Sequence, residues 1–98
     1  MNDNKRIIKN EKRLDDTLQS IKLMQEALDI FKSNKKNIDL LNKYYGSKEW
    51  FKDKEDLEQK RIIGIKAGVL SEDAVWNMNE DIKELLIEMN DIINLYSK

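Results

Sequence analysis

Residues 71–97 have the sequence SEDAVWNMNEDIKELLIEMNDIINLYS, and this stretch decides the fold. Large apolar side chains recur in it at alternating steps of three and four positions, at Val75, Met78, Ile82, Leu85, Met89, Ile92 and Tyr96. This spacing places them on one face of an α-helix, and Leu86 and Ile93 widen that face as in the helices of a bundle. The hydroxyl of Ser71 is placed to cap the first turn. We therefore predict a helix over residues 72–97 whose apolar face is buried against another helix.

The opening third of the chain is expected to supply that other helix. Its apolar residues form a less regular stripe, at Ile7, Leu14, Leu18, Ile21, Leu28 and Phe31. Glu11 and Gln25 interrupt the heptad, but the pattern still predicts a helix over about residues 3–32. Two helices of similar length with apolar stripes bury them most readily by packing side by side, so we expect an antiparallel pair.

The middle of the chain is expected to form shorter elements. The SNKKN segment at 33–37 indicates a turn, and a helix of about three turns should follow it and end at Gly46. Ser47 is placed to cap another short helix, and RIIGIKAGVL at 61–70 has no helical period, which predicts an irregular connection. The predicted fold is thus an all-α small helical bundle. It has two long antiparallel helices, two short helices and an irregular loop, in one domain over residues 1–98.

Composition limits the classes of function. The chain has no Cys and no His, which removes disulfides, thiolate zinc sites, Cys nucleophiles and the commonest acid–base side chain. The 98 residues include 18 Lys+Arg and 19 Asp+Glu, so a strong field for nucleic acid is not expected. Residues 1–49 carry a balance of +3 and residues 50–98 one of −4, and these halves can pair with each other. No apolar run spans a membrane and none resembles a signal peptide, so we expect a cytoplasmic protein.

Two groups of residues are candidates for contact with a protein partner. Five of the seven aromatic residues lie between positions 44 and 76, and most of them are expected in the core. Tyr45 and Trp50 flank the turn at Gly46, so at least one of them is expected at the surface. The second group is an acidic stripe beside the apolar seam, consisting of Asp81, Glu84, Glu88 and Asp91. Without His these carboxylates do not match a di-metal centre, so neither metal nor cofactor is expected.

Catalysis has little support in the sequence. No nucleophile elbow, phosphate-binding loop or metal motif is present. The pair Asp53 and Asp56, close to Trp50, is the only one that suggests acid–base chemistry. We expect no enzyme, and a small enzyme using Asp53 and Asp56 stays as an alternative.

Two motifs carry a resemblance to a known family. YYGSKEWFKDKED at 44–56 and GVLSED at 68–73 resemble the pattern of small bacterial proteins catalogued as domain of unknown function 4298. The matching positions are Tyr44, Tyr45, Ser47, Trp50 and Asp53, and then Gly68 through Asp73. The resemblance implies no reaction, substrate or cofactor. It suggests that the motifs meet, either as a structural clamp or as a recognition surface, with Asp53 accepting hydrogen bonds from N–H groups of residues 66–71.

The sequence therefore favours a non-enzymatic protein-interaction module. The contact residues would be Tyr45, Trp50 and Asp53 or the acidic stripe of the last helix. An alternative is an inhibitor from a phage or mobile element that binds and blocks a host nuclease or immunity protein, since an acidic helix can occupy a basic channel. A homodimer also stays open, because the apolar seam of the last helix can face the first helix or a second copy.

Overall fold

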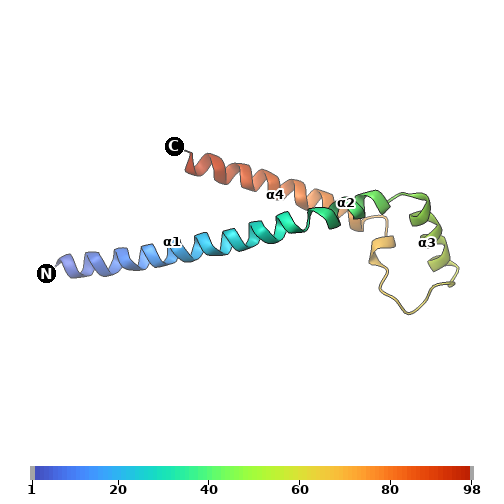
Figure 1. Ribbon diagram of the computed structural model, residues 1–98, viewed down its shortest axis with the longest axis horizontal. Helices are drawn as coiled ribbons and strands as arrows, with labels where there is room; N and C mark the ends of the chain where they lie inside the picture. Colours follow the sequence, from blue (N-terminus) through green and yellow to red (C-terminus); the bar gives the residue numbers. More distant parts are fainter. Residues whose placement is uncertain (1, 98) are drawn as a thin grey trace. The chain divides into compact units, whose positions relative to one another are not determined.

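Helices account for all the regular structure in the part of the chain that the structure describes. The computed structural model describes the backbone of residues 2–97 and the side chains of residues 4–97 (Figure 1). Its elements, in chain order, are α1 (Asn2–Ser33), α2 (Lys35–Tyr44), α3 (Lys48–Glu58), the 3₁₀ turn η1 (Gly68–Leu70) and α4 (Ala74–Tyr96). No strand occurs in residues 2–97. The prediction of an all-α protein is confirmed.

The chain divides into two compact units, residues 1–38 and residues 39–98. The first unit is built on α1, which confirms the predicted long helix to within a residue at each end. Its surface carries local contacts between successive turns, such as the ion pair between Lys12 Nζ and Asp16 Oδ2 at 2.9 Å. No side chain described in residues 4–38 is buried. The apolar stripe of α1 is therefore not covered by other residues of the first unit.

The break between α1 and α2 is narrower than the predicted turn at 33–37. Asn34 alone lies outside both helices, and its N–H donates to the carbonyl oxygens of Ile30 and Phe31. The N–H of Ile38 donates in turn to the Asn34 carbonyl, which starts the next helix. The two lysines after Asn34 are good helix formers and belong to α2. The predicted turn at 33–37 was therefore too long, because polar residues were taken as a sign of a turn.

The second unit holds the buried core. Trp50 of α3, Leu70 of η1 and Val75 of α4 are 4%, 7% and 3% exposed. They come from three successive elements that are joined by loops, so this core fixes α3, η1 and the start of α4 to one another.

The turns around the core form as predicted. Gly46 has a φ of +77°, the left-handed conformation that glycine adopts at little cost, and it separates α2 from α3. The Ser47 hydroxyl accepts from the N–H of Trp50 at 3.2 Å and caps α3. The segment between α3 and η1 is irregular, as expected, and it leaves Ile63 and Ile65 exposed.

The last helix begins two residues later than predicted, at Ala74. Asp73, and not Ser71, stands at the N-cap position, but the Ser71 hydroxyl accepts from the N–H of Ala74 at 3.1 Å, which is the expected hydrogen bond to the first turn. The end of α4 carries large apolar side chains that are 42% to 83% exposed, namely Leu85, Leu86, Ile87, Ile92, Ile93, Leu95 and Tyr96. Of the predicted seam, Val75 is buried and Met78, Ile82 and Met89 are half-buried, whereas Leu85, Ile92 and Tyr96 are exposed. The antiparallel packing of the two long helices is not confirmed. Within residues 2–97, α1 and α4 are each too polar or too short to cross a membrane, as are the other helices.

Candidate functional site

Trp50 joins the two sequence motifs. Its indole N–H donates to the backbone carbonyl of Val69 at 3.0 Å, across 19 positions of sequence. Its ring also meets those of Tyr45 and Phe51 edge to face, with centroids 5.2 Å and 5.0 Å away. A buried Trp needs a partner for its N–H, and here the 3₁₀ turn supplies one. Trp50 therefore acts inside this unit and not at its surface.

Two more contacts tie the same motifs together at Glu72. The Tyr45 hydroxyl donates to the Glu72 carbonyl oxygen at 2.5 Å. Lys54 Nζ donates to Glu72 Oε1 at 2.9 Å and lies 5.1 Å from the centroid of the Trp50 ring. The hydrogen bond to Glu72 raises the pKa of Lys54, and the same bond lowers the pKa of Glu72. We call the residues that make these contacts, Tyr45, Trp50, Lys54, Val69 and Glu72, the Trp50 clamp.

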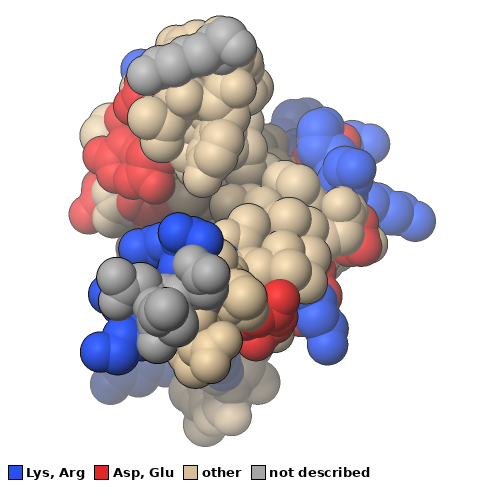
Figure 2. All heavy atoms as spheres, turned by 90° about the vertical axis from the view of Figure 1, so that its left-hand side faces the viewer, with Lys and Arg blue, Asp and Glu red and all other residues tan. Residues whose placement is uncertain are grey.

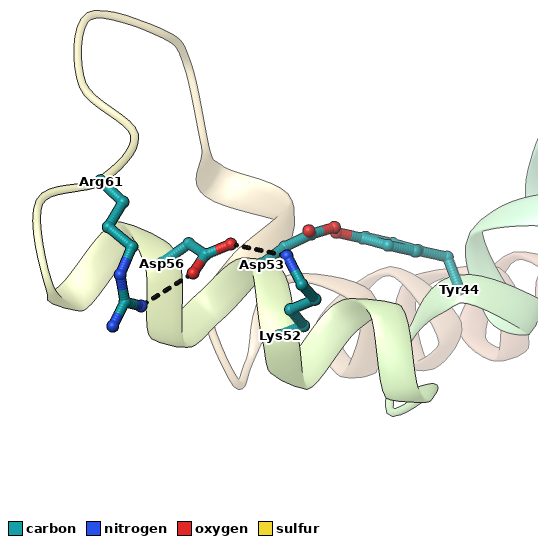
Figure 3. A network of polar contacts seen from close by, with 5 residues as sticks. All are labelled: Tyr44, Lys52, Asp53, Asp56 and Arg61. Carbon is teal, nitrogen blue, oxygen red and sulfur yellow. Dashed lines mark hydrogen bonds and ion pairs between the residues drawn. The ribbon is translucent and has the colours of Figure 1, made fainter.

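Asp53 has a different role from the one the sequence suggested. Its carboxylate accepts from the Tyr44 hydroxyl at 2.5 Å, so the bond connects α3 to α2 (Figure 3). This hydrogen bond, aided by burial, raises the pKa of Tyr44 to about 12. The contact expected between Asp53 and the N–H groups of residues 66–71 is replaced by the bond from Trp50 to Val69.

Asp56 lies between two cations at the end of α3. Lys52 Nζ donates to its Oδ2 at 3.1 Å, and Arg61 Nη1 donates to its Oδ1 at 2.8 Å (Figure 3). The hydrogen bond from Lys52, followed by that from Arg61, lowers the pKa of Asp56. A general acid at neutral pH needs a raised carboxyl pKa, and the pKa of Asp56 is shifted the other way. The two carboxylates of the catalytic hypothesis thus belong to separate local networks.

The acidic stripe lies at the surface, as the sequence suggested. All four of its carboxylate residues, Asp81, Glu84, Glu88 and Asp91, are exposed. Figure 2 shows acidic side chains gathered on one side of α4. In residues 2–97 no group of three or more potential ligands is arranged to hold a metal ion. The side chains of the stripe are therefore open to solvent.

Two apolar residues of α4 share this acidic side and were missed by the sequence analysis. Ile87 and Leu95 are 56% and 64% exposed and lie off the apolar seam. Ile87 follows Glu84 by three positions and precedes Asp91 by four, and Leu95 follows Asp91 by four. Residues at these spacings are neighbours on a helix surface. The sequence did contain a signal for them, because Ile87 and Leu95 are large apolar residues that do not fit the three-and-four spacing of the seam.

A pair of asparagines joins α2 to α4. The Asn42 amide donates to Asn79 Oδ1 at 3.3 Å, and the Asn79 amide donates back to Asn42 Oδ1 at 2.8 Å. The hydrogen bond from Tyr45 to Glu72 joins the residue just after α2 to a residue just before α4. Moving forward along α2 thus moves backward toward the start of α4, so the two segments run antiparallel. No sequence pattern had pointed to this pair, because single asparagines carry no periodic signal.

Comparison with known proteins gives one relationship. No curated protein and no solved structure is significantly similar to the chain. The family model described as Domain of unknown function (DUF4298) matches residues 7–92, which contain both motifs and the whole Trp50 clamp. Because this match covers most of the chain, the protein belongs to the DUF4298 family.

Proposed function

We propose that the chain is a non-enzymatic protein-interaction module whose contact element is α4. The observation that carries the proposal is the pair Leu85 and Ile87, which are 44% and 56% exposed. Residues two positions apart point to nearly opposite sides of a helix, so one neighbouring helix cannot cover both. One side of α4 is therefore left for a partner even when the other side is covered.

The inner side of α4 suits the first part of the same chain. The bonds from Asn42 to Asn79 and from Tyr45 to Glu72 start an antiparallel alignment of α2 and α4. Continued along the helix, this alignment lays the apolar seam of α4, which includes Ile82, Leu85 and Met89, along α2 and the end of α1. The antiparallel packing of the two long helices is thus part of the proposal.

The outer side of α4 suits a basic partner. We define the outer face as Asp81, Glu84, Ile87, Glu88, Asp91 and Leu95, all of which are exposed. Ile87 and Leu95 supply apolar anchors and the carboxylates surround them, which is the arrangement of a small apolar centre with a polar rim. The matching surface is an apolar patch bordered by Lys and Arg, and the charges would speed association and make it sensitive to salt. The lack of Cys fits a cytoplasmic setting for this interaction.

A second candidate function uses the same face. The four carboxylates follow α4 over ten residues, about 15 Å, which is long enough to imitate part of a nucleic-acid backbone. A basic nuclease channel would then be the target, and the protein would be an inhibitor of the kind carried by phages and mobile elements. Capture of a nuclease that loses activity in the complex would favour this candidate over a general interaction module.

The outer face is tested by affinity capture from the native cell with three baits. The first is the wild-type chain, and the second carries Asp81→Asn, Glu84→Gln, Glu88→Gln and Asp91→Asn. The third is a matched control that neutralises four exposed carboxylates elsewhere, with Gln at Glu26, Glu49, Glu55 and Glu58. We expect a defined partner that is retained by the wild type and the control and reduced at least about 10-fold for the second bait and at high salt. Equal capture by the second bait would refute the role of the outer face.

The apolar anchors are tested on the partner so identified. Ile87→Ser with Leu95→Ser should weaken binding by about 10-fold or more without removing its salt dependence, because the carboxylates remain. The control is Ile63→Ser with Ile65→Ser, which changes two exposed isoleucines outside α4. Binding that is unchanged by the first pair would show that charge alone carries the contact.

A further inference from the structure

The segment between α3 and η1 has a charge opposite to that of the outer face of α4. Residues 59–71 contain three cations, Lys60, Arg61 and Lys66, and no Asp or Glu. Two isoleucines of the same segment, Ile63 and Ile65, are 77% and 64% exposed. We call these five residues the basic loop. An apolar centre between cations is the kind of surface that the outer face requires of a partner.

The basic loop is fixed at both ends. The backbone N–H of Arg61 donates to the Asp56 carbonyl oxygen at 2.8 Å, and Arg61 Nη1 donates to Asp56 Oδ1 at 2.8 Å. At the other end, the carbonyl oxygen of Val69 accepts from Trp50 within the Trp50 clamp. A loop that is held in this way loses little conformational freedom when it binds, which favours affinity.

Neither surface has its charge neutralised by its own chain. The side chains of Lys60 and Lys66 make no hydrogen bond or ion pair with the residues that the structure describes. The same holds, among those residues, for the four carboxylates of the outer face. Both surfaces belong to the second unit and both are exposed there, so the loop does not cover the outer face of its own chain.

The basic loop suits an acidic protein surface better than it suits nucleic acid. Residues 59–71 contain no aromatic side chain that could stack on a base. Arg61 is already paired with Asp56, which leaves two cations to meet phosphates, and tight binding to nucleic acid needs several. The outer face offers both carboxylates for these cations and apolar side chains for the isoleucines.

We infer that the outer face of α4 binds the basic loop of a second copy of the chain. This inference rests on the proposed function, because it names the partner of the same face. Ile63 and Ile65 of the partner subunit contact Ile87 and Leu95, and the cations of that loop lie among the carboxylates. Each copy has one loop and one face, so mutual exchange makes two identical contacts and closes a two-fold dimer.

Reversal of charge on each surface tests the inference with the purified full chain. Light scattering during gel filtration at low salt should give twice the mass of one chain for the wild type. The loop variant, Lys60→Glu with Lys66→Glu, should raise the dissociation constant of the dimer at least about 10-fold, and so should the face variant, Glu84→Lys with Glu88→Lys. An equimolar mixture of the two variants should regain the dimer, because each reversed loop then meets a reversed face.

Two further variants control for general effects of charge and identify the partner. Lys43→Glu with Lys48→Glu reverses two exposed lysines outside the loop and should leave the dimer intact. Ile63→Ser with Ile65→Ser should raise the dissociation constant of the dimer at least about 10-fold, and it should not affect capture of a different protein by the outer face. The near-ultraviolet circular dichroism of the buried Trp50 should be the same in every variant, which shows that the second unit is folded.

The outcomes separate this inference from the proposed function. A monomeric wild type, a dimer insensitive to the loop variant, or a mixture of the loop and face variants that stays monomeric would each overturn the inference. Capture of another protein through the outer face, together with a monomeric wild type, would leave the proposed function standing without it. A dimer that is lost in both charge variants and regained in their mixture would support the exchange of loops.

Discussion

The indole N–H of Trp50 donates to the carbonyl oxygen of Val69 at 3.0 Å, and this bond links α3 to the 3₁₀ turn that precedes α4. The donor of this bond is buried, since Trp50 is only 4% exposed, and the acceptor residue Val69 is half-buried. Its geometry explains why the two family motifs, separated by an irregular segment, act as one structural unit. The start of α4 is held by this unit.

Removing the indole N–H should destabilise the second unit. Trp50→Phe keeps an aromatic ring but leaves the Val69 carbonyl without its donor, so the free energy of unfolding should fall by about 1–3 kcal/mol. Trp50→Ala also leaves a cavity and should cost about 3–5 kcal/mol. Urea unfolding followed by circular dichroism measures both values. The control is Trp76→Phe, which alters an exposed Trp and should change stability by less than about 0.5 kcal/mol. Equal costs at the two tryptophans would contradict the role given to Trp50.

The hydrogen bond to Asp53 should delay ionisation of Tyr44. Its pKa is raised from 10.0 to about 12, so the folded state holds the phenol proton where an unfolded chain releases it. The stabilisation is complete below pH 10 and is lost as the pH rises toward 12. The difference in phenolate absorbance between wild type and Tyr44→Phe gives this titration directly. Asp53→Asn should move its midpoint to lower pH, and an unmoved midpoint would show that Asp53 is not the cause.

The ion pairs of Asp56 should make stability depend on acid pH. The pKa of Asp56 is lowered below its ordinary value of 3.8 by Lys52 and Arg61. Its contribution is therefore present at neutral pH and is lost as the pH falls below 3.8 through the folded-state pKa. Asp56→Asn should be less stable than wild type at pH 7, and the difference should shrink in acid. Glu55→Gln, an exposed neighbour, is the control, and the prediction fails if both variants show the same pH dependence.

Substitution of Gly46 should destabilise the protein because of its backbone conformation alone. A Cβ at this position would meet no atom within 4 Å, but the φ of +77° is costly for any other residue. Gly46→Ala should therefore lower the free energy of unfolding by about 1–2 kcal/mol. Gly68 has equal space and no left-handed φ, so Gly68→Ala should leave stability unchanged or raise it by up to about 1 kcal/mol. Thermal or urea unfolding of the two variants, compared directly, decides between backbone strain and steric crowding.

The sequence predicted the helices well because their signals are local. Gly46 and Ser47 stand next to the residues that they affect, and Ser71 lies three positions before the N–H that it caps. The turn at 33–37 was overestimated for a related reason: Asn34 alone breaks the helix, and its polar neighbours were counted with it. Composition over five residues does not distinguish a loop from a helix rich in lysine.

The sequence predicted which residues form the candidate site, but not which hydrogen bonds they make. Trp50, Asp53 and Lys54 are three and four positions apart, so they share one side of α3 and each was able to reach the second motif. Periodicity does not say which of them meets a backbone group many residues later. In the structure, Trp50 forms a hydrogen bond with Val69, Lys54 with Glu72, and Asp53 with Tyr44. Phe51 and Trp76, counted among aromatics expected mostly in the core, are exposed.

By itself the sequence determined where the helices lie and which side of each is apolar, because those properties depend on residues within a few turns of one another. Only the tertiary structure decided that Trp50 is buried against Val69 and that Asn42 is level with Asn79. These facts depend on contacts between segments far apart in the chain. Such contacts are set by side-chain shape and the paths of the connecting loops, which no local spacing records.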